Sequence, residues 1–146
     1  MPPGSPERDR KGDPFSVRFT TSTDRMVEAE ARRTRRSKSA VVEALTEEAV
    51  RTRRFPGIAF RGDDARRRPW LIGTGLDIWE IVQMFEDFGS LETLVENTQI
   101  SDRQVRLALA YRDFYPEEIA AAIAENRRSS DAWHELYPFI ELPATP

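Results

Sequence analysis

The chain has 146 residues, 39% of them hydrophobic, which is enough for one ordinary domain or two small ones, and its formal net charge is −3. It contains no cysteine and a single histidine, which excludes disulfides, thiolate catalysis and cysteine-based zinc sites, and we expect neither a metal nor a cofactor. No apolar run approaches about 18 residues, so the sequence predicts no membrane association. The absence of cysteine fits a cytoplasmic protein.

The charges are unevenly distributed along the chain. Residues 1–68 contain 17 Lys or Arg against 11 Asp or Glu, whereas residues 69–146 contain 5 against 14. A basic half attracts phosphate and an acidic half repels it. The distribution therefore favours two modules of opposite character, the first with an affinity for phosphate.

Residues 1–13 are rich in proline, glycine and charge and lack the apolar core of a signal peptide, so we expect a disordered arm. Arg8, Arg10 and Lys11 could contact a DNA backbone. The simpler interpretation is that the arm has no specific role.

Residues 15–20 alternate apolar and polar side chains, which is typical of a β-strand. The apolar row, which can be buried on one face, consists of Phe15, Val17 and Phe19. The opposite, outward-facing row consists of Ser16, Arg18 and Thr20. One strand has no independent stability and no second strand follows nearby, so this strand needs a partner. The alternative is an ordinary edge strand in a small α+β domain.

Two helices are expected after this strand. The sequence Thr21-Ser22-Thr23-Asp24 is a capping-type start, and Ser37 can cap the second helix. Apolar residues of the second helix follow the 3.6-residue period at Val41, Val42, Leu45 and Ala49. A strand-helix-helix unit of roughly 40 residues cannot bury enough surface alone. We therefore expect a homodimer, or a higher even oligomer, in which two copies of the strand pair antiparallel.

A two-stranded β-ribbon fits the major groove of B-DNA, where each copy would present its polar row to the base edges. Arg18 is the best candidate for a bidentate contact to guanine. The expected partner is therefore operator DNA, contacted in the major groove. The basic corner at residues 32–36 has an alternative interpretation as a solvated helix face.

Residues 14–54 resemble the ribbon-helix-helix repressors of the Arc and MetJ type. The corner between the helices of that family typically reads Arg-Thr-Gly-Arg-Ser, and Arg33-Thr34-Arg35-Arg36-Ser37 matches it except at Arg35. If Arg35 adopts a positive φ, the strain is of order 1 kcal/mol, which an added cation near phosphate could offset. The resemblance implies a dimeric β-ribbon, with phosphate bound by backbone N–H groups at the start of the second helix. The expected DNA-binding residues are Ser16, Arg18, Thr20, Arg35, Arg36, Ser37 and Lys38.

A second module is expected over residues 56–125. Phe55-Pro56-Gly57 interrupts the chain, and residues 58–60 and 70–72 are the expected strands of a short β-hairpin. Gly73-Thr74-Gly75 is interpreted as a turn; an anion-binding nest is the alternative, but no phosphate-loop lysine follows it. The expected helix starts, at Asp77, Ser90, Ser101 and Pro116, predict a compact helical bundle and a mainly α fold class.

This module resembles the bacterial family called domain of unknown function 433. The matching segments are residues 71–79 and 105–111, and the family's Gly-Thr-Arg-Ile-Pro is here Gly-Thr-Gly-Leu-Asp. The resemblance implies a helix-turn-helix-like core and an antitoxin that acts beside a PIN-type toxin, a metal-dependent ribonuclease. Arg103, Gln104 and Arg106 lie early in the expected recognition helix, but the acidity of the module favours scaffolding or oligomerisation over DNA binding.

The tail, residues 126–146, is apolar but interrupted by proline. Apolar clusters of this kind often mark a partner surface. The expected toxin-binding residues are Arg127, Arg128, Trp133, Leu136, Tyr137, Phe139 and Ile140. One of the arginines would approach the toxin's metal-binding carboxylates. The alternative is that the tail packs on its own module, and His134 is interpreted as a surface or packed residue.

The sequence therefore predicts a DNA-binding antitoxin of a type II toxin–antitoxin system, which represses its own operon and neutralises a PIN-type ribonuclease. The alternative is a stand-alone ribbon-helix-helix regulator whose C-terminal module senses a signal or oligomerises. We do not expect an enzyme, because no spacing of carboxylates brings a catalytic pair together.

Overall fold

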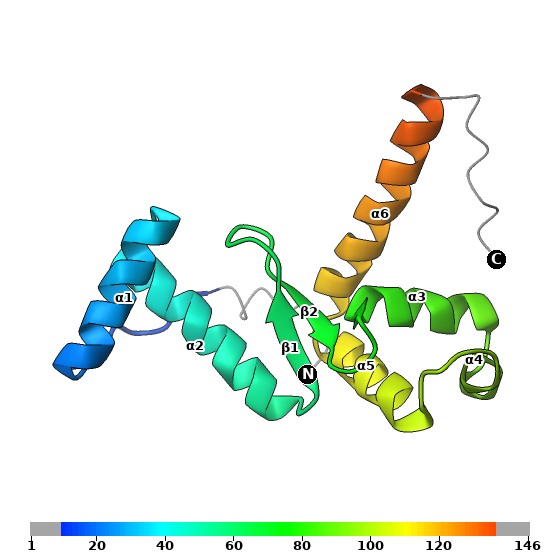
Figure 1. Ribbon diagram of the computed structural model, residues 1–146, viewed down its shortest axis with the longest axis horizontal. Coiled ribbons are helices and arrows are strands. Elements are labelled where there is room, and N and C mark those ends of the chain that lie inside the picture. Colours follow the sequence, from blue (N-terminus) through cyan, green and yellow to red (C-terminus); the bar gives the residue numbers. More distant parts are fainter. Residues whose placement is uncertain (1–9, 137–146) are drawn as a thin grey trace. The chain divides into compact units, whose positions relative to one another are not determined.

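A computed structural model describes residues 10–136, with side chains described as far as Arg127 (Figure 1). Within these residues there are six helices and three short strands, so the expectation of a mainly α protein is confirmed. The described chain forms two compact units, residues 10–69 and residues 70–136. The division falls between Pro69 and Trp70, inside the region expected to form a hairpin.

The first unit is built on two packed helices, α1 (Thr21–Thr34) and α2 (Lys38–Arg54) (Figure 1). Ser37 caps α2 as expected: its side-chain oxygen accepts a hydrogen bond from the backbone N–H of Ala40 at 3.1 Å. The cap of α1 is Thr20, whose hydroxyl accepts from the backbone N–H of Thr23 at 3.3 Å. Both helices therefore begin where a local side-chain acceptor satisfies their first free N–H groups.

The turn between α1 and α2 is set by Arg35. Its φ of 54° lies in the left-handed region, and among residues 10–136 it is the only non-glycine residue with a positive φ. The Arg36 N–H donates to the Ala31 carbonyl at 3.1 Å and the Arg35 N–H donates to the Arg32 carbonyl at 3.3 Å. This pair of bonds is the Schellman arrangement, in which glycine is usual because it has no Cβ to clash. The corner thus has the shape of a glycine turn with an arginine in the strained position.

Residues 11–20 lie outside every helix and every hydrogen-bonded strand of the structure. A strand is defined by backbone hydrogen bonds to a neighbour, and within residues 10–136 no segment pairs with residues 14–20. The expected strand was assigned a partner in a second copy of the chain. The β-ribbon therefore stays a prediction.

Three short strands follow α2, namely β1 (Ile58–Arg61), β2 (Arg68–Leu71) and β3 (Leu76–Asp77), and they form one sheet in that order. The first two lie close to the expected hairpin strands, although β2 begins and ends earlier than predicted. The strand β3 was not predicted. It pairs antiparallel with β2 through the register Trp70 with Asp77 and Leu71 with Leu76, because the glycine turn at residues 72–75 reverses the chain.

The second unit is a bundle of α3 (Ile78–Phe88), α4 (Leu91–Asn97), α5 (Asp102–Phe114) and α6 (Pro116–Leu136) (Figure 1). The helix starts expected from the sequence are all present, including the capping boxes of Asp77 with Glu80 and Ser101 with Gln104. The helix α3 packs against the other three. The core consists of Leu71, Ile78, Ile81, Val82, Leu94, Ile100, Val105, Ala108, Tyr111, Ile119 and Ile123.

The last helix is longer than the sequence suggested. The expected boundary between module and tail, at residues 125 and 126, lies inside α6, which continues to Leu136. Residues 126–136 contain neither proline nor glycine, and the first proline beyond them is Pro138. Because the residue before a proline is disfavoured in the α conformation, the sequence allows the helix to continue until this point. The C-terminal turns of α6 project beyond the other helices of the unit (Figure 1).

We expect Arg35→Gly to raise the free energy of unfolding by about 1 kcal/mol, because glycine adopts a positive φ without a Cβ clash. Urea denaturation measures this difference. The matched control is Arg25→Gly inside α1, where a helical glycine lowers stability by about 1 kcal/mol. A less stable Arg35→Gly protein would show that the corner stores no strain.

Candidate nucleic-acid interface

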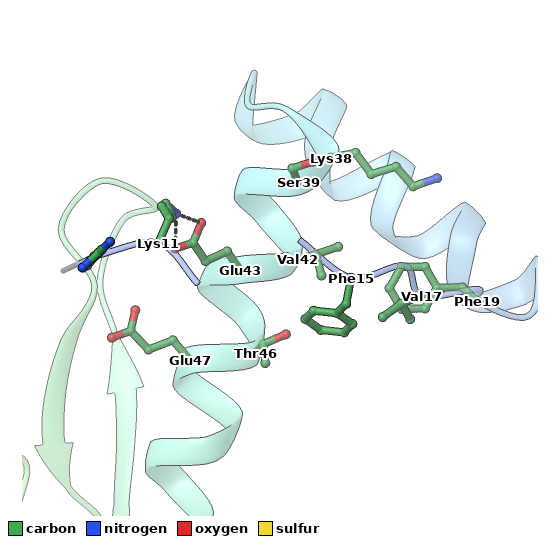
Figure 2. A pocket seen from close by; sticks show the side chains of 11 residues that line it. Lys11, Phe15, Val17, Phe19, Lys38, Ser39, Val42, Glu43, Thr46 and Glu47 are labelled. Atoms are coloured by element: carbon green, nitrogen blue, oxygen red, sulfur yellow. Dashed lines mark hydrogen bonds and ion pairs between the residues drawn. The ribbon is translucent and has the colours of Figure 1, made fainter. Parts of the chain in front are cut away.

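The N-terminal segment runs beside α2 and borders an open groove of about 810 Å³ (Figure 2). The ring of Phe15 lies next to Val42 and Thr46 of α2 in this groove. At one end Lys11 Nζ lies 2.5 Å from Glu43 Oε1, and at the other end the chain enters α1 through the Thr20 cap. The segment therefore lies along α2 but is not enclosed by it.

The apolar row of this segment is exposed in a single copy. Phe15 is 86% exposed, Val17 is 56% exposed and Phe19 is 36% exposed. The sequence predicted that one face of the strand can be buried, and the burial of these three residues by a second copy stays a prediction. Exposed apolar side chains grouped in this way usually mark a contact surface.

The helix α2 adds to the same exposed apolar surface. Leu45 and Ala49 were expected on its buried face, and this expectation is wrong for one copy, because both are exposed. Among the four expected core residues of α2, only Val41 is fully buried, and Val42 is half-buried. The described residues of the first unit therefore cover only part of the apolar face of α2.

The polar row of the expected strand is only partly available. Ser16 and Arg18 are exposed. The hydroxyl of Thr20, in contrast, caps α1 and also donates to Thr23 Oγ1 at 3.0 Å. Thr20 is itself exposed, so its contact with DNA stays a prediction, and the structure adds that its hydroxyl caps α1.

The cations of the corner differ in how far they are neutralised. Lys38 forms ion pairs with Asp24 and, at 3.8 Å, with Glu28, both on α1. The hydrogen bond to Asp24 is the main reason that the pKa of Lys38 is raised. Arg35 is exposed, and Arg36 Nε makes one long hydrogen bond, of 3.4 Å, to Thr34 Oγ1. Lys38 therefore holds α1 to α2, while the two arginines are better placed to meet an anion.

The start of α2 offers a further set of donors. The first N–H groups of a helix have no carbonyl partner within the helix, and a positive partial charge accumulates there. In α2 the Ser37 side chain satisfies the N–H of Ala40, and the Val41 N–H donates to the Ser37 carbonyl at 3.1 Å. The N–H groups of Lys38 and Ser39 come before the first of these hydrogen bonds, close in the chain to the exposed Arg35.

Arg33 is a structural residue of the corner that was not among the expected DNA-binding residues. Its Nε donates to Glu30 Oε2 at 3.0 Å, and its Nη2 donates to Asp64 Oδ1 at 3.0 Å. The bond to Glu30 is the largest contribution that raises the pKa of Arg33, and it also lowers the pKa of Glu30. The spacing of Glu30 and Arg33 on a helix could have been recognised in the sequence. The contact with Asp64 could not, because 31 residues separate the two.

The expected recognition helix of the second module, α5, has two of its three polar residues in local contacts. Gln104 completes the capping box, with its Oε1 accepting from the Ser101 N–H at 2.9 Å. Arg106 Nε donates to Asp102 Oδ2 at 2.7 Å, and this bond raises the pKa of Arg106. Arg103 is exposed. The scaffolding or oligomerisation role expected for this module stays a prediction.

The expected toxin-binding residues fall on α6 and beyond it. Arg127 is exposed and borders a groove of about 550 Å³ that is also lined by Val82, Ile119 and Ile123. Arg128, Trp133 and Leu136 belong to α6, but their side chains lie outside the described ones. Tyr137, Phe139 and Ile140 lie outside the described residues. The structure therefore places one of the seven expected side chains.

Within the described residues no group of His, Cys, Asp and Glu side chains is arranged to hold a metal ion. Helices long and apolar enough to cross a membrane are also missing from that part of the chain. Comparison with protein-family models, with curated proteins and with solved structures found no match to this chain. Its function is therefore inferred from its own residues.

Proposed function

We propose that this protein is a DNA-binding antitoxin that acts as a homodimer. Two copies would pair their N-terminal segments into a β-ribbon, and the ribbon would bind operator DNA in the major groove. The observation that carries the proposal is the exposed apolar row of residues 15–19, which lies beside an exposed apolar stripe of α2 and next to a cationic corner.

The dimer follows from the balance of buried and exposed apolar groups. In the first unit only Val27, Val41, Phe55 and Ile58 are buried apolar residues, whereas Phe15, Val17, Met26, Leu45 and Val50 are exposed. Fully burying a side chain the size of Val or Phe contributes roughly 1.5–3 kcal/mol. A second copy that covers such exposed side chains would therefore add apolar burial that the isolated unit lacks.

The proposed DNA contacts use the cationic groups that have no ion pair with a described carboxylate of the first unit. In the proposed ribbon, Arg18 would extend from the polar face, where its planar guanidinium can donate two hydrogen bonds to a guanine edge. Backbone phosphates would be bound by the N–H groups at the start of α2, together with Arg35 and Arg36. Lys38 contributes less in this proposal, because two carboxylates of α1 already pair with it.

The antitoxin part of the proposal rests on the sequence pattern of residues 56–125, from which the antitoxin role was expected, and on the apolar composition of the tail. The helix α6 continues into the expected tail as far as Leu136, so the proposed toxin-binding segment would begin as a helix. An amphipathic helix commonly lays its apolar face into a hydrophobic groove of a partner protein. The partner would be a PIN-type ribonuclease.

Replacing two residues of the apolar row tests the dimer. We expect the wild-type chain to be a dimer in sedimentation equilibrium and Phe15→Ser/Val17→Ser to weaken dimerisation by at least about 3 kcal/mol, or a hundredfold. Ile72→Ser, which changes an equally exposed apolar residue of the second unit, is the control and leaves the dimer unchanged. A wild-type chain that is monomeric at every concentration would sink the proposal.

Replacing Arg18 tests DNA recognition. An operator is first selected by the wild-type protein from a random duplex library, and gel shifts then compare this operator with a scrambled duplex. Arg18→Ala is expected to lose about 1–3 kcal/mol of discrimination for each of the two contacts in a symmetric dimer. Arg36→Ala is expected to weaken both duplexes alike, as the loss of a phosphate contact does. Unchanged discrimination in Arg18→Ala would refute the assignment of base contacts to this segment.

Co-expression with the product of the adjacent gene tests the antitoxin role. We expect the two proteins to co-purify, and we expect deletion of residues 133–146 to abolish this association while operator binding persists. The deletion removes the proposed apolar anchors and leaves every described residue of the first unit in place. If the full-length chain binds its operator but not the neighbouring protein, it is a stand-alone regulator instead.

A further inference from the structure

The loop between β1 and β2, residues 61–68, has a fixed shape. Its first turn is closed by a hydrogen bond of 2.8 Å from the Arg66 N–H to the Asp63 carbonyl. Gly62 has a φ of +109°, and a Cβ on it would lie only 2.5 Å from the Arg66 carbonyl oxygen. Gly62 therefore allows the two sides of the loop to approach more closely than any other residue would.

Arg67 fastens this loop to the strand before it and to α2. Its guanidinium donates to the Gly62 carbonyl at 3.2 Å and to the Phe60 carbonyl at 3.1 Å. The same group donates to Glu48 Oε1 of α2 at 2.7 Å. The charge and the hydrogen-bond donors of Arg67 are therefore engaged inside the unit, where they orient the loop.

Asp64 fastens the loop to the corner between α1 and α2. Its carboxylate receives two hydrogen bonds from Arg33, of 3.0 and 3.4 Å. The remaining donors of Arg33 are held by Glu30 on α1. The loop is therefore tied at two points to the helical pair, and one of these points is the cationic corner itself.

These contacts leave Arg66 as a cation presented by a fixed loop. Its side chain is exposed, and among residues 10–136 no carboxylate forms an ion pair with it. Of the two carboxylates in the loop, Asp64 is neutralised by Arg33, and Asp63 is exposed at the turn. Among the basic residues of segments 32–38 and 61–68, Arg33, Lys38 and Arg67 pair with carboxylates of the same unit. Arg35 and Arg66, in contrast, are exposed.

We propose that the loop of residues 61–68 is a second phosphate-binding element, with Arg66 contacting the backbone of the DNA duplex beside the phosphate that the corner binds. This inference rests on the proposed DNA-binding function and extends its footprint. A planar guanidinium matches the geometry of a phosphate, and a contact with backbone phosphate carries no sequence information. In the proposed dimer each copy adds one such element, so the duplex would be held on both sides of the ribbon.

Because the loop has a fixed shape, we expect Arg66 to make a measurable contribution to DNA affinity. A long side chain on a flexible segment loses conformational entropy when it binds, and this loss cancels much of a surface ion pair. Here Gly62, Asp64 and Arg67 have already ordered the backbone that carries Arg66. The cost of ordering on DNA binding is reduced to that of a single side chain.

Salt dependence on a mixed-sequence duplex tests the proposal without knowledge of the operator. The affinity of the protein for a labelled duplex of about 30 base pairs, roughly three helical turns, is measured by fluorescence anisotropy at several salt concentrations. Arg66→Ala is expected to lower the slope of log affinity against log salt by about 0.9 per bound copy. The control Arg53→Ala removes the same charge from the exposed end of α2 and is expected to leave the slope unchanged.

A charge-neutral variant separates a built element from net charge. Gly62→Ala keeps every arginine but forces the loop to open, so we expect it to lower the slope in the same direction as Arg66→Ala. Equal slopes for Arg66→Ala and Arg53→Ala would overturn the proposal, and a wild-type slope for Gly62→Ala would overturn the part assigned to loop shape. Neither result would change the operator discrimination that depends on Arg18. A failure of the loop proposal can therefore be distinguished from a failure of the proposed function. A wild-type chain that binds no duplex would end both.

Discussion

The left-handed conformation of Arg35 is the constraint from which the geometry of the first unit follows. It ends α1 and sends the chain directly into α2, so that the caps and cations of both helix ends share one corner. From this turn Lys38 reaches back to the carboxylates of α1, and Arg33 reaches outward to Asp64. An arginine at this position adds a positive charge that glycine would not carry, and it costs about 1 kcal/mol of backbone strain.

The two ends of the first unit differ in how completely they are packed. At the corner, side chains from α1, α2 and the β1–β2 loop are fastened by ion pairs and hydrogen bonds. Along the outer side of α2, apolar groups lie open beside Phe15 and Val17. Surface ion pairs contribute little to stability, whereas apolar burial dominates it. The proposed dimer would cover the open apolar side of α2 and leave the corner to its ion pairs and hydrogen bonds.

The sequence predicted the local features of the fold well, because helix caps depend on neighbouring residues. Ser37, Asp77, Ser90 and Ser101 all begin helices as expected. The two-residue strand β3 was missed because so short a strand has no periodicity. The length of α6 was missed because its last turns were interpreted from their apolar content and not from their lack of helix breakers.

The candidate site was predictable only where its residues are close in the chain. The positive φ of Arg35 followed from the corner motif, but the engagement of Thr20 as a cap and of Lys38 with α1 required the fold. The tie between Arg33 and Asp64 joins residues that no periodicity relates. Charge pattern shows which residues carry a charge, and only the packed structure shows which charges are already neutralised.

The opposite charges of the two halves of the chain have a consequence for the proposed complex. Residues 69–146 hold 14 carboxylates and 5 basic residues, and the cations Arg106 and Arg112 pair with carboxylates of their own helix. A polyanion is repelled by such a surface at distances up to a Debye length, about 8 Å at physiological salt. In the proposed complex the acidic half would therefore disfavour its own contact with the duplex and favour contact with the basic corner.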